Sequence, residues 1–250
     1  MASKPDKNIG GPLRIDSLSQ KLKLKVSDVN RIKRSKKPSR ASQTQSSGIA
    51  DRCQNVSNGL FQMLLRAGAE EHIETFLKEH GLEILKSKFF ILISNHEIVI
   101  CDESSNLVTK HNAKIHLNAL HLAILAQQGR AVGCILKGIL TDKTEEEHTK
   151  KSILFNILST EIELENVSNA SSDINKLNLK GMNAFHLSCQ CFPKAIEIFS
   201  ALVCDHEGKC SLPVLENLLN VLKNVVEGKN RDGNTPLHIA AKQSSVESVR

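Results

Sequence analysis

At 250 residues, of which 40% are hydrophobic, the chain is long enough to bury a substantial core. Its seven cysteines are odd in number and scattered, which argues against a disulfide-stabilised secreted domain and for free thiols in a reducing compartment. No segment has the apolar length of a bilayer span, and the N-terminus lacks the apolar core of a signal peptide, so we expect a soluble intracellular protein.

Residues 1–50 are rich in Ser, Lys, Arg, Gln and Gly and poor in aromatic residues. Such a composition buries too little apolar surface to fold, so we expect a disordered basic tail that carries much of the net charge of +6. Six of the ten residues 31–40 are basic, a density typical of nuclear-import signals. The residues assigned to import are Arg31, Lys33, Arg34, Lys36 and Lys37. The alternatives are a solvated tail without a localisation signal, or a tail that binds nucleic acid or acidic lipid loosely.

Residues 51–111 are predicted to form a helical cap or a degenerate repeat, followed by a β-hairpin. Residues 60–66 and 70–78 have the apolar spacing of helices, and Gly81 is placed to end the second one. Two apolar runs between residues 89 and 101 flank a polar turn, which predicts two short strands.

The most informative motif lies at residues 230–241 and has the sequence NRDGNTPLHIAA. Asp232 and Gly233 suit a hairpin tip, because glycine accepts a positive φ. Thr235 is placed to cap a helix in which Pro236 takes the first position, where a missing N–H costs nothing. A narrow apolar face follows, which lets a neighbouring unit stack closely. Turn, cap and face in this order resemble the opening of an ankyrin repeat.

Two weaker copies of this motif precede it. Residues 173–189 carry a similar hairpin with Asn-Ala-Phe-His in place of Thr-Pro-Leu-His, and residues 118–124 fit a first helix. From His121 to His186 there are 65 residues, and from His186 to His238 there are 52, against about 33 in a regular ankyrin unit. The spacing therefore predicts inserted segments.

Residues 212–222 are predicted to form an extra amphipathic helix within the later insertion. A further, degenerate repeat is possible at residues 152–158. These residues lack the glycine, the proline and the small-residue face of the motif, so the sequence leaves the presence of a repeat open. The last copy stops within its second helix, just after Val249, so we expect a fragment or a truncated gene product.

These copies predict an all-α ankyrin-repeat solenoid with β-hairpin tips over residues 112–250. Its core should contain the apolar positions that recur after each histidine: Leu120, Leu122, Val132, Ile135, Phe185, Leu187, Leu237, Ile239 and Val249. On this basis Leu237→Ala should cost roughly 2–5 kcal/mol of stability.

No catalytic motif is found, since a phosphate-binding P-loop, a dinucleotide-binding glycine motif, HExxH and GxSxG are all absent. We therefore expect neither an enzyme nor a cofactor, and we expect the recurring histidines to be structural. One group of soft ligands is large enough for zinc, but its spacing matches no common zinc module: Cys189, Cys191, Cys204, His206 and Cys210. We predict no metal site, a buried Cys189, and free thiols at Cys204 and Cys210 in a mobile insertion.

Within the ankyrin class, the chain resembles the inhibitors of Rel/nuclear factor kappa-B transcription factors. Residues 121–124 (HLAI), 186–189 (HLSC) and 230–238 are similar to that family's first, third and fourth repeats. The resemblance implies a nuclear or cytoplasmic regulator that binds Rel-type factors. The second repeat is barely recognisable, and the Asp-Ser-Gly phosphorylation signal of the cytoplasmic branch is absent.

The predicted function is therefore a non-enzymatic protein-interaction module in the cytoplasm, the nucleus or both, acting in signal transduction and transcription regulation. Partner binding is assigned to four residues expected to lie exposed at the tips: Lys180, Lys229, Asn230 and Arg231. Two alternatives stay open. One is the N-terminal arm of a larger channel or enzyme, truncated at residue 250, and the other is a nucleic-acid-associated protein that uses its basic tail.

Overall fold

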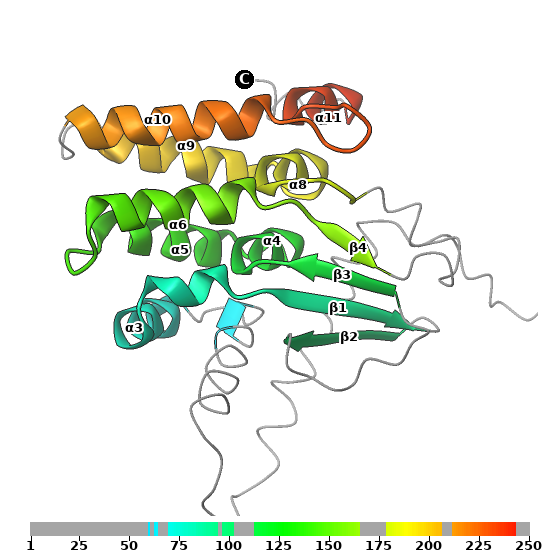
Figure 1. The fold of residues 1–250 in the computed structure, drawn as a ribbon, viewed down its shortest axis with the longest axis horizontal. Coiled ribbons are helices and arrows are strands. Elements are labelled where there is room, and N and C mark those ends of the chain that lie inside the picture. The colour runs from blue at the N-terminus through cyan, green and yellow to red at the C-terminus, as the bar shows by residue number, and fades with distance from the viewer. Residues whose placement is uncertain are drawn as a thin grey trace, which may run out of the picture.

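The computed structural model describes residues 60, 63–64, 70–94, 97–102, 113–165, 179–206 and 212–243. The predicted tail, with every residue assigned to import, lies outside these ranges, as do Val249 and Cys210. The described part is mostly helical, and its helices form successive layers from α3 (Glu70–His80) at one end to α11 (Pro236–Lys242) at the other (Figure 1).

Three short helices start in the same way, and we call them the inner helices. They are α4 (Ala119–Leu125), α8 (Ala184–Cys191) and α11. In each, the N-cap side-chain oxygen accepts the backbone N–H of the histidine three residues on, and the histidine Nδ1 accepts the N-cap N–H. The N-caps are Asn118, Asn183 and Thr235, and the histidines are His121, His186 and His238. This shared start confirms the alignment of the three copies.

The first two inner helices are each followed by two more helices. After α4 come α5 (Gly129–Thr141) and α6 (Glu147–Ser159), and after α8 come α9 (Lys194–His206) and α10 (Leu212–Glu227). We call α6 and α10 the third helices. They account for the wide spacing of the motifs: α10 is the predicted extra helix, and residues 152–158 lie inside α6 as part of one helix, not as a helix pair.

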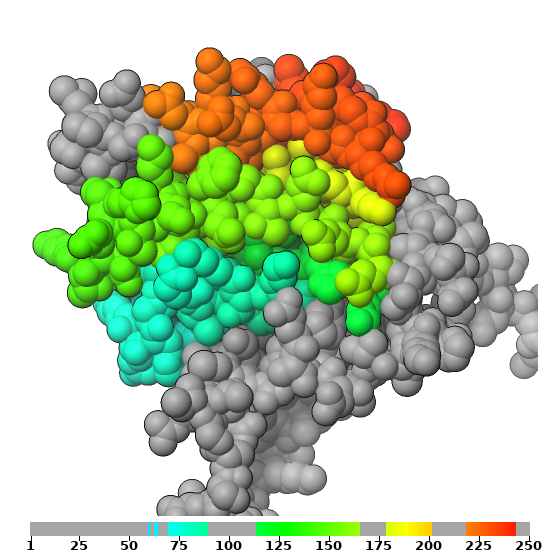
Figure 2. All heavy atoms as spheres, in the orientation of Figure 1, coloured from blue at the N-terminus to red at the C-terminus, as the bar shows by residue number. Residues whose placement is uncertain are grey.

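Helices of one kind stack on one another from layer to layer. α8 packs on α4 and α11 on α8, α9 packs on α5, and α10 packs on α6. Below them, α3 packs on α5, and the 3-10 helix η1 (Leu82–Lys86) packs on α6. Figure 2 shows the resulting order of layers, from the α3 end to α10 and α11.

Helix α3 confirms the prediction for residues 70–78. Its face of Ile73, Phe76 and Leu77 is buried, and Gly81 ends it with a φ of 76°. Gly138 in α5 lets α5 approach α3 closely, since a Cβ at that position would lie 3.2 Å from Leu77 Cδ1.

A four-stranded antiparallel sheet stands beside the helices, which corrects the prediction of an all-α fold. Its order is β2 (Glu97–Asp102), β1 (Phe89–Ser94), β3 (Ala113–Leu117) and β4 (Glu163–Glu165). The hairpin of β1 and β2 confirms the two predicted strands. The missed strands β3 and β4 are short, and β4 pairs only with β3, about 50 residues earlier in the chain, so local patterning could not reveal them.

Most of the predicted core positions are buried, but Leu237 is not. Leu120, Phe185 and Leu237 each lie two residues after an N-cap, and their exposed fractions are 0%, 7% and 55%. α8 packs on α4 and α11 packs on α8, whereas no described helix follows α11. The other predicted core residues in the described ranges are buried: Leu122, Val132, Ile135, Leu187 and Ile239.

Candidate interaction surface

The first candidate surface is the turn at residues 179–183, which precedes α8. Gly181 has a φ of 74°, and Met182 N–H donates to the Leu179 carbonyl at 3.1 Å. Ile162, just before β4, donates to the Met182 carbonyl and accepts from Gly181 N–H. The turn is therefore held by its own hydrogen bond and by the pair of backbone hydrogen bonds to Ile162. The Lys180 side chain is exposed.

The second turn, at residues 230–234, precedes α11 and is fixed in a different way. The Asn230 side-chain oxygen accepts the backbone N–H groups of Asp232 and Asn234, at 3.0 and 2.9 Å. Asn230 N–H donates to the Asn234 carbonyl, and Gly233, with a φ of 78°, donates to the Asn230 carbonyl. The predicted glycine tip is thus confirmed, and the asparagine closes the loop.

The two turns lie directly against each other. A Cβ placed on Gly181 would come 2.8 Å from the backbone nitrogen of Arg231. His186 Nε2 lies 2.8 Å from the Asn234 carbonyl, so the second layer bonds to the turn of the third. Since a carbonyl oxygen can only accept, Nε2 carries a proton and donates to that carbonyl.

Comparison with known proteins identifies the repeat. A family model, the ankyrin repeat, matches residues 232–250, which begin within this second turn. The chain carries an ankyrin repeat. No curated protein and no solved structure matches it. Ankyrin repeats are typically non-catalytic modules for protein–protein interaction, with binding surfaces formed by stacked units.

Three of the four residues assigned to partner binding are exposed on the turns of this ankyrin-repeat protein. They are Lys180 on the first turn, Arg231 on the second, and Lys229 immediately before the second. Asn230 is buried, with 5% of its surface exposed, so its predicted exposure is wrong. Its side chain faces inward because it accepts the hydrogen bonds that close the turn.

The histidines of the ankyrin motif act as structural residues. His121 is buried, and burial lowers its pKa from 6.5 to about 3, so it stays neutral at physiological pH. Burial also lowers the pKa of His186, partly offset by the Asn234 carbonyl. A neutral imidazole suits His186, whose Nδ1 accepts the N-cap N–H and whose Nε2 donates to the Asn234 carbonyl.

The cysteines follow the prediction only in part. Cys189 is buried, as predicted, and burial raises the pKa of its thiol to about 11, which makes it unreactive. Cys204 lies in helix α9 and not in a mobile insertion, because that helix runs on to His206. In the described ranges no cluster of three or more His, Cys, Asp or Glu side chains is placed to hold a metal.

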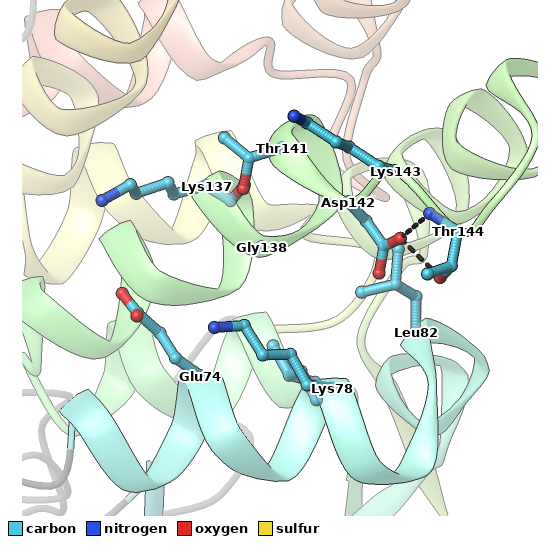
Figure 3. A pocket seen from close by; sticks show the side chains of 10 residues that line it. Glu74, Lys78, Leu82, Lys137, Gly138, Thr141, Asp142, Lys143 and Thr144 are labelled. Atoms are coloured by element: carbon cyan, nitrogen blue, oxygen red, sulfur yellow. Dashed lines mark hydrogen bonds between the residues drawn. The ribbon is translucent and has the colours of Figure 1, made fainter.

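A groove of about 480 Å³ lies between α3 and the end of α5, and its rim is charged with both signs (Figure 3). Lys78 and Lys137 extend from its two helices near Glu74. The Asp142 carboxylate accepts from the Thr144 hydroxyl and backbone N–H at 2.6 Å, which lowers the pKa of that carboxyl. Asp142 therefore shapes the turn before α6.

Sequence reasoning missed the second role of two N-caps. Asn118 Nδ2 donates to the Ile157 carbonyl near the end of α6, and Asn183 Nδ2 donates to the Val225 carbonyl near the end of α10, both at 2.8 Å. Each asparagine thus ties an inner helix to the third helix of its own layer. The available signal was asparagine in the first two copies where the third has Thr235.

No helix in the described residues is both long enough and apolar enough to cross a membrane.

Proposed function

We propose that this ankyrin-repeat protein is a non-enzymatic adaptor, a solenoid of stacked layers that binds a protein partner through its turn tips. The observation that carries the proposal is the pair of contacting turns that presents Lys180, Lys229 and Arg231 to solvent. Hydrogen bonds hold the backbones of both turns, so these side chains can bind a partner without a change in backbone conformation.

The finer form of the proposal makes the partner a Rel-type transcription factor, and the protein a nuclear or cytoplasmic regulator of it. Its support is the resemblance at residues 121–124, 186–189 and 230–238. Three cations on adjacent turns favour an acidic partner surface, with association that is steered electrostatically and weakened by salt.

The test is the affinity for a purified Rel-type domain, measured by isothermal titration calorimetry. The charge reversals Lys180→Glu and Arg231→Glu together should weaken binding by about tenfold or more. The matched control reverses Lys194 and Lys242, which are also exposed but lie on helices α9 and α11. Equal losses in both variants would show a general charge effect, and no binding by the unmodified chain would remove Rel-type factors as partners.

Nuclear import is tested separately in cells. Replacing Lys33, Arg34, Lys36 and Lys37 by Ala should move a fluorescently tagged chain toward the cytoplasm while its partner affinity stays unchanged. An unchanged distribution would contradict the import assignment alone.

A further inference from the structure

Two threonines in the chain are followed by the same pattern of glutamates. Thr144 begins the sequence TEEE at residues 144–147, and Thr160 begins the sequence TEIE at residues 160–163. In both, a glutamate stands one residue and three residues after the hydroxyl. Negative charge just after a hydroxyl is a pattern by which protein kinases with a basic substrate groove select their targets. The sequence alone does not distinguish the two threonines, but their surroundings in the fold do.

The segment around Thr160 is bonded to its neighbours in the fold. Thr160 is partly buried, and its hydroxyl donates to the Asn156 carbonyl of α6 at 2.6 Å. Ile162 bonds through both its backbone groups to the turn at residues 179–183, and Glu163 lies in β4, which pairs with β3. A kinase binds its substrate as an extended peptide, which requires free backbone around the target. The backbone of the TEIE segment is already used by the sheet and the turn.

The segment around Thr144 is free of such pairing. Thr144 is exposed in the short connection between α5 and α6. Its hydroxyl and N–H, and the N–H of Glu145, donate to the Asp142 carboxylate within the same connection (Figure 3). Glu146 precedes α6 and is exposed, and Glu147 is the first residue of that helix and is also exposed. The hydroxyl and the glutamates after it are therefore accessible together.

Among the residues whose exposure the structure describes, the other exposed serines and threonines lie in helices. They are Thr75 in α3, Thr141 in α5, Ser152 in α6 and Ser200 in α9. Thr75 and Thr141 donate their hydroxyls to the carbonyl four residues earlier, as is common in helices. Exposure, a non-helical backbone and the following glutamates thus coincide at Thr144.

We propose that Thr144 is a phosphorylation site for an acid-directed serine/threonine kinase. In the transfer, Thr144 Oγ1 attacks the γ-phosphorus of ATP, and an O–P bond forms while the bond from that phosphorus to the bridging oxygen breaks. ADP leaves with the electron pair of the broken bond, and the hydroxyl proton passes to a carboxylate of the kinase. The inference goes beyond the proposed adaptor function and does not depend on which partner the turns bind.

Phosphorylation changes the groove between α3 and α5, because Thr144 is one of its lining residues. The charged residues of this groove are three lysines and two carboxylates: Lys78, Lys137, Lys143, Glu74 and Asp142. A phosphate adds a charge of about −1.5 to −2, which turns the net charge of the rim from positive to negative. It also replaces the hydroxyl that donates to Asp142 by a like charge, so the connection changes conformation.

The test is incubation of the full chain with Mg²⁺, ATP and a purified serine/threonine kinase that selects targets followed by acidic residues. Mass spectrometry of the digested product should place phosphate at Thr144 and not at Thr160. Thr144→Val should abolish phosphorylation at this site, while the matched control Thr160→Val should keep it. Absence of phosphate at Thr144 overturns the proposal. Equal phosphorylation of both threonines also overturns it, because the fold then does not select between them.

The role of the glutamates is tested with two matched pairs of substitutions. Glu145→Gln with Glu147→Gln should lower kcat/KM for phosphorylation of Thr144 by about tenfold or more. Glu161→Gln with Glu163→Gln removes the same charges after Thr160 and should leave this kcat/KM unchanged. The circular dichroism of both variants should match that of the parent chain. Equal kcat/KM values for the two pairs would overturn the assignment to an acid-directed kinase.

A synthetic peptide of residues 155–168 shows whether the fold is what protects Thr160. The isolated peptide has no sheet or turn to bind, so the same kinase should phosphorylate it at Thr160. A peptide that stays unmodified would mean that the sequence already separates the two threonines, which removes the structural ground of the proposal.

Discussion

At the scale of single residues, the N-cap asparagines connect local and tertiary structure. The side-chain oxygen of Asn183 accepts the N–H groups of Phe185 and His186, which starts α8. Its Nδ2 donates across 42 residues to Val225. One side chain therefore stabilises a helix start and attaches the third helix to the same layer.

Replacing Asn183 should thus cost more than removing an ordinary cap. Asn183→Ala loses the cap, about 0.5–2 kcal/mol, and leaves a carbonyl without its donor, about 1–3 kcal/mol more. Thr235→Ala should cost only about 1 kcal/mol, because Thr235 caps its helix without a bond to a third helix. Urea unfolding followed by circular dichroism measures both, and equal costs would contradict the second role of Asn183.

His121 should make the protein sensitive to mild acid. The pKa of His121 is about 3 in the folded chain and near 6.5 in the unfolded chain. Between these pH values His121 is therefore protonated only in the unfolded chain. Its contribution to stability is therefore complete above pH 6.5 and is lost as the pH falls toward 3. Urea midpoints measured over this range should fall less steeply for His121→Gln than for the parent chain. Parallel curves would show that His121 does not set the slope.

At the scale of elements, the two turns before α8 and α11 both need glycine, but for different reasons. Both glycines have a positive φ, but a Cβ at Gly233 would have no atom within 4 Å, whereas a Cβ at Gly181 would meet the Arg231 backbone. Both turns have internal hydrogen bonds, but only the turn at residues 179–183 also needs glycine because a neighbouring turn lies against it.

Alanine at these two glycines should therefore differ in its cost. Gly233→Ala should lose about 1 kcal/mol through backbone strain alone. Gly181→Ala adds a contact with backbone that cannot move aside, which should cost about 1–3 kcal/mol more. Thermal unfolding of the two variants checks the order, and a Gly233→Ala variant as unstable as Gly181→Ala would contradict the close contact of the turns.

At the scale of the whole molecule, stacking decides which motif residues are in the core. Leu187 and Leu237 both belong to the motif, yet Leu187 is fully buried and Leu237 is more than half exposed. In a stack, each layer contacts only its neighbours, so a helix in the last described layer lacks the cover that a helix between two layers has.

The expected cost of Leu237→Ala is accordingly revised to about 0.5 kcal/mol or less, as for a surface position. Leu187→Ala should cost about 2–5 kcal/mol, because it leaves a cavity between packed layers. Chemical denaturation of the two variants tests this difference, and a large loss at Leu237 would mean that another part of the protein covers it.

The sequence by itself determined the helix starts and the turn tips. Caps, glycine turns and the bonds between each N-cap and its histidine involve residues at most four positions apart, so the motif at 230–241 and its two copies sufficed to place them. The spacing of apolar residues also predicted α3, α10 and the hairpin of β1 and β2.

Only the tertiary structure decided how the layers are completed and what they leave exposed. The anchoring of α6 and α10, the pairing of β3 with β4 and the contact of Gly181 with Arg231 all join residues far apart in the chain. Burial likewise depends on whether a neighbouring layer packs against a residue, so the equivalent residues Phe185 and Leu237 differ, with 7% and 55% of their surfaces exposed. The motif is repeated, but its surroundings change from layer to layer, and the surroundings set the exposure.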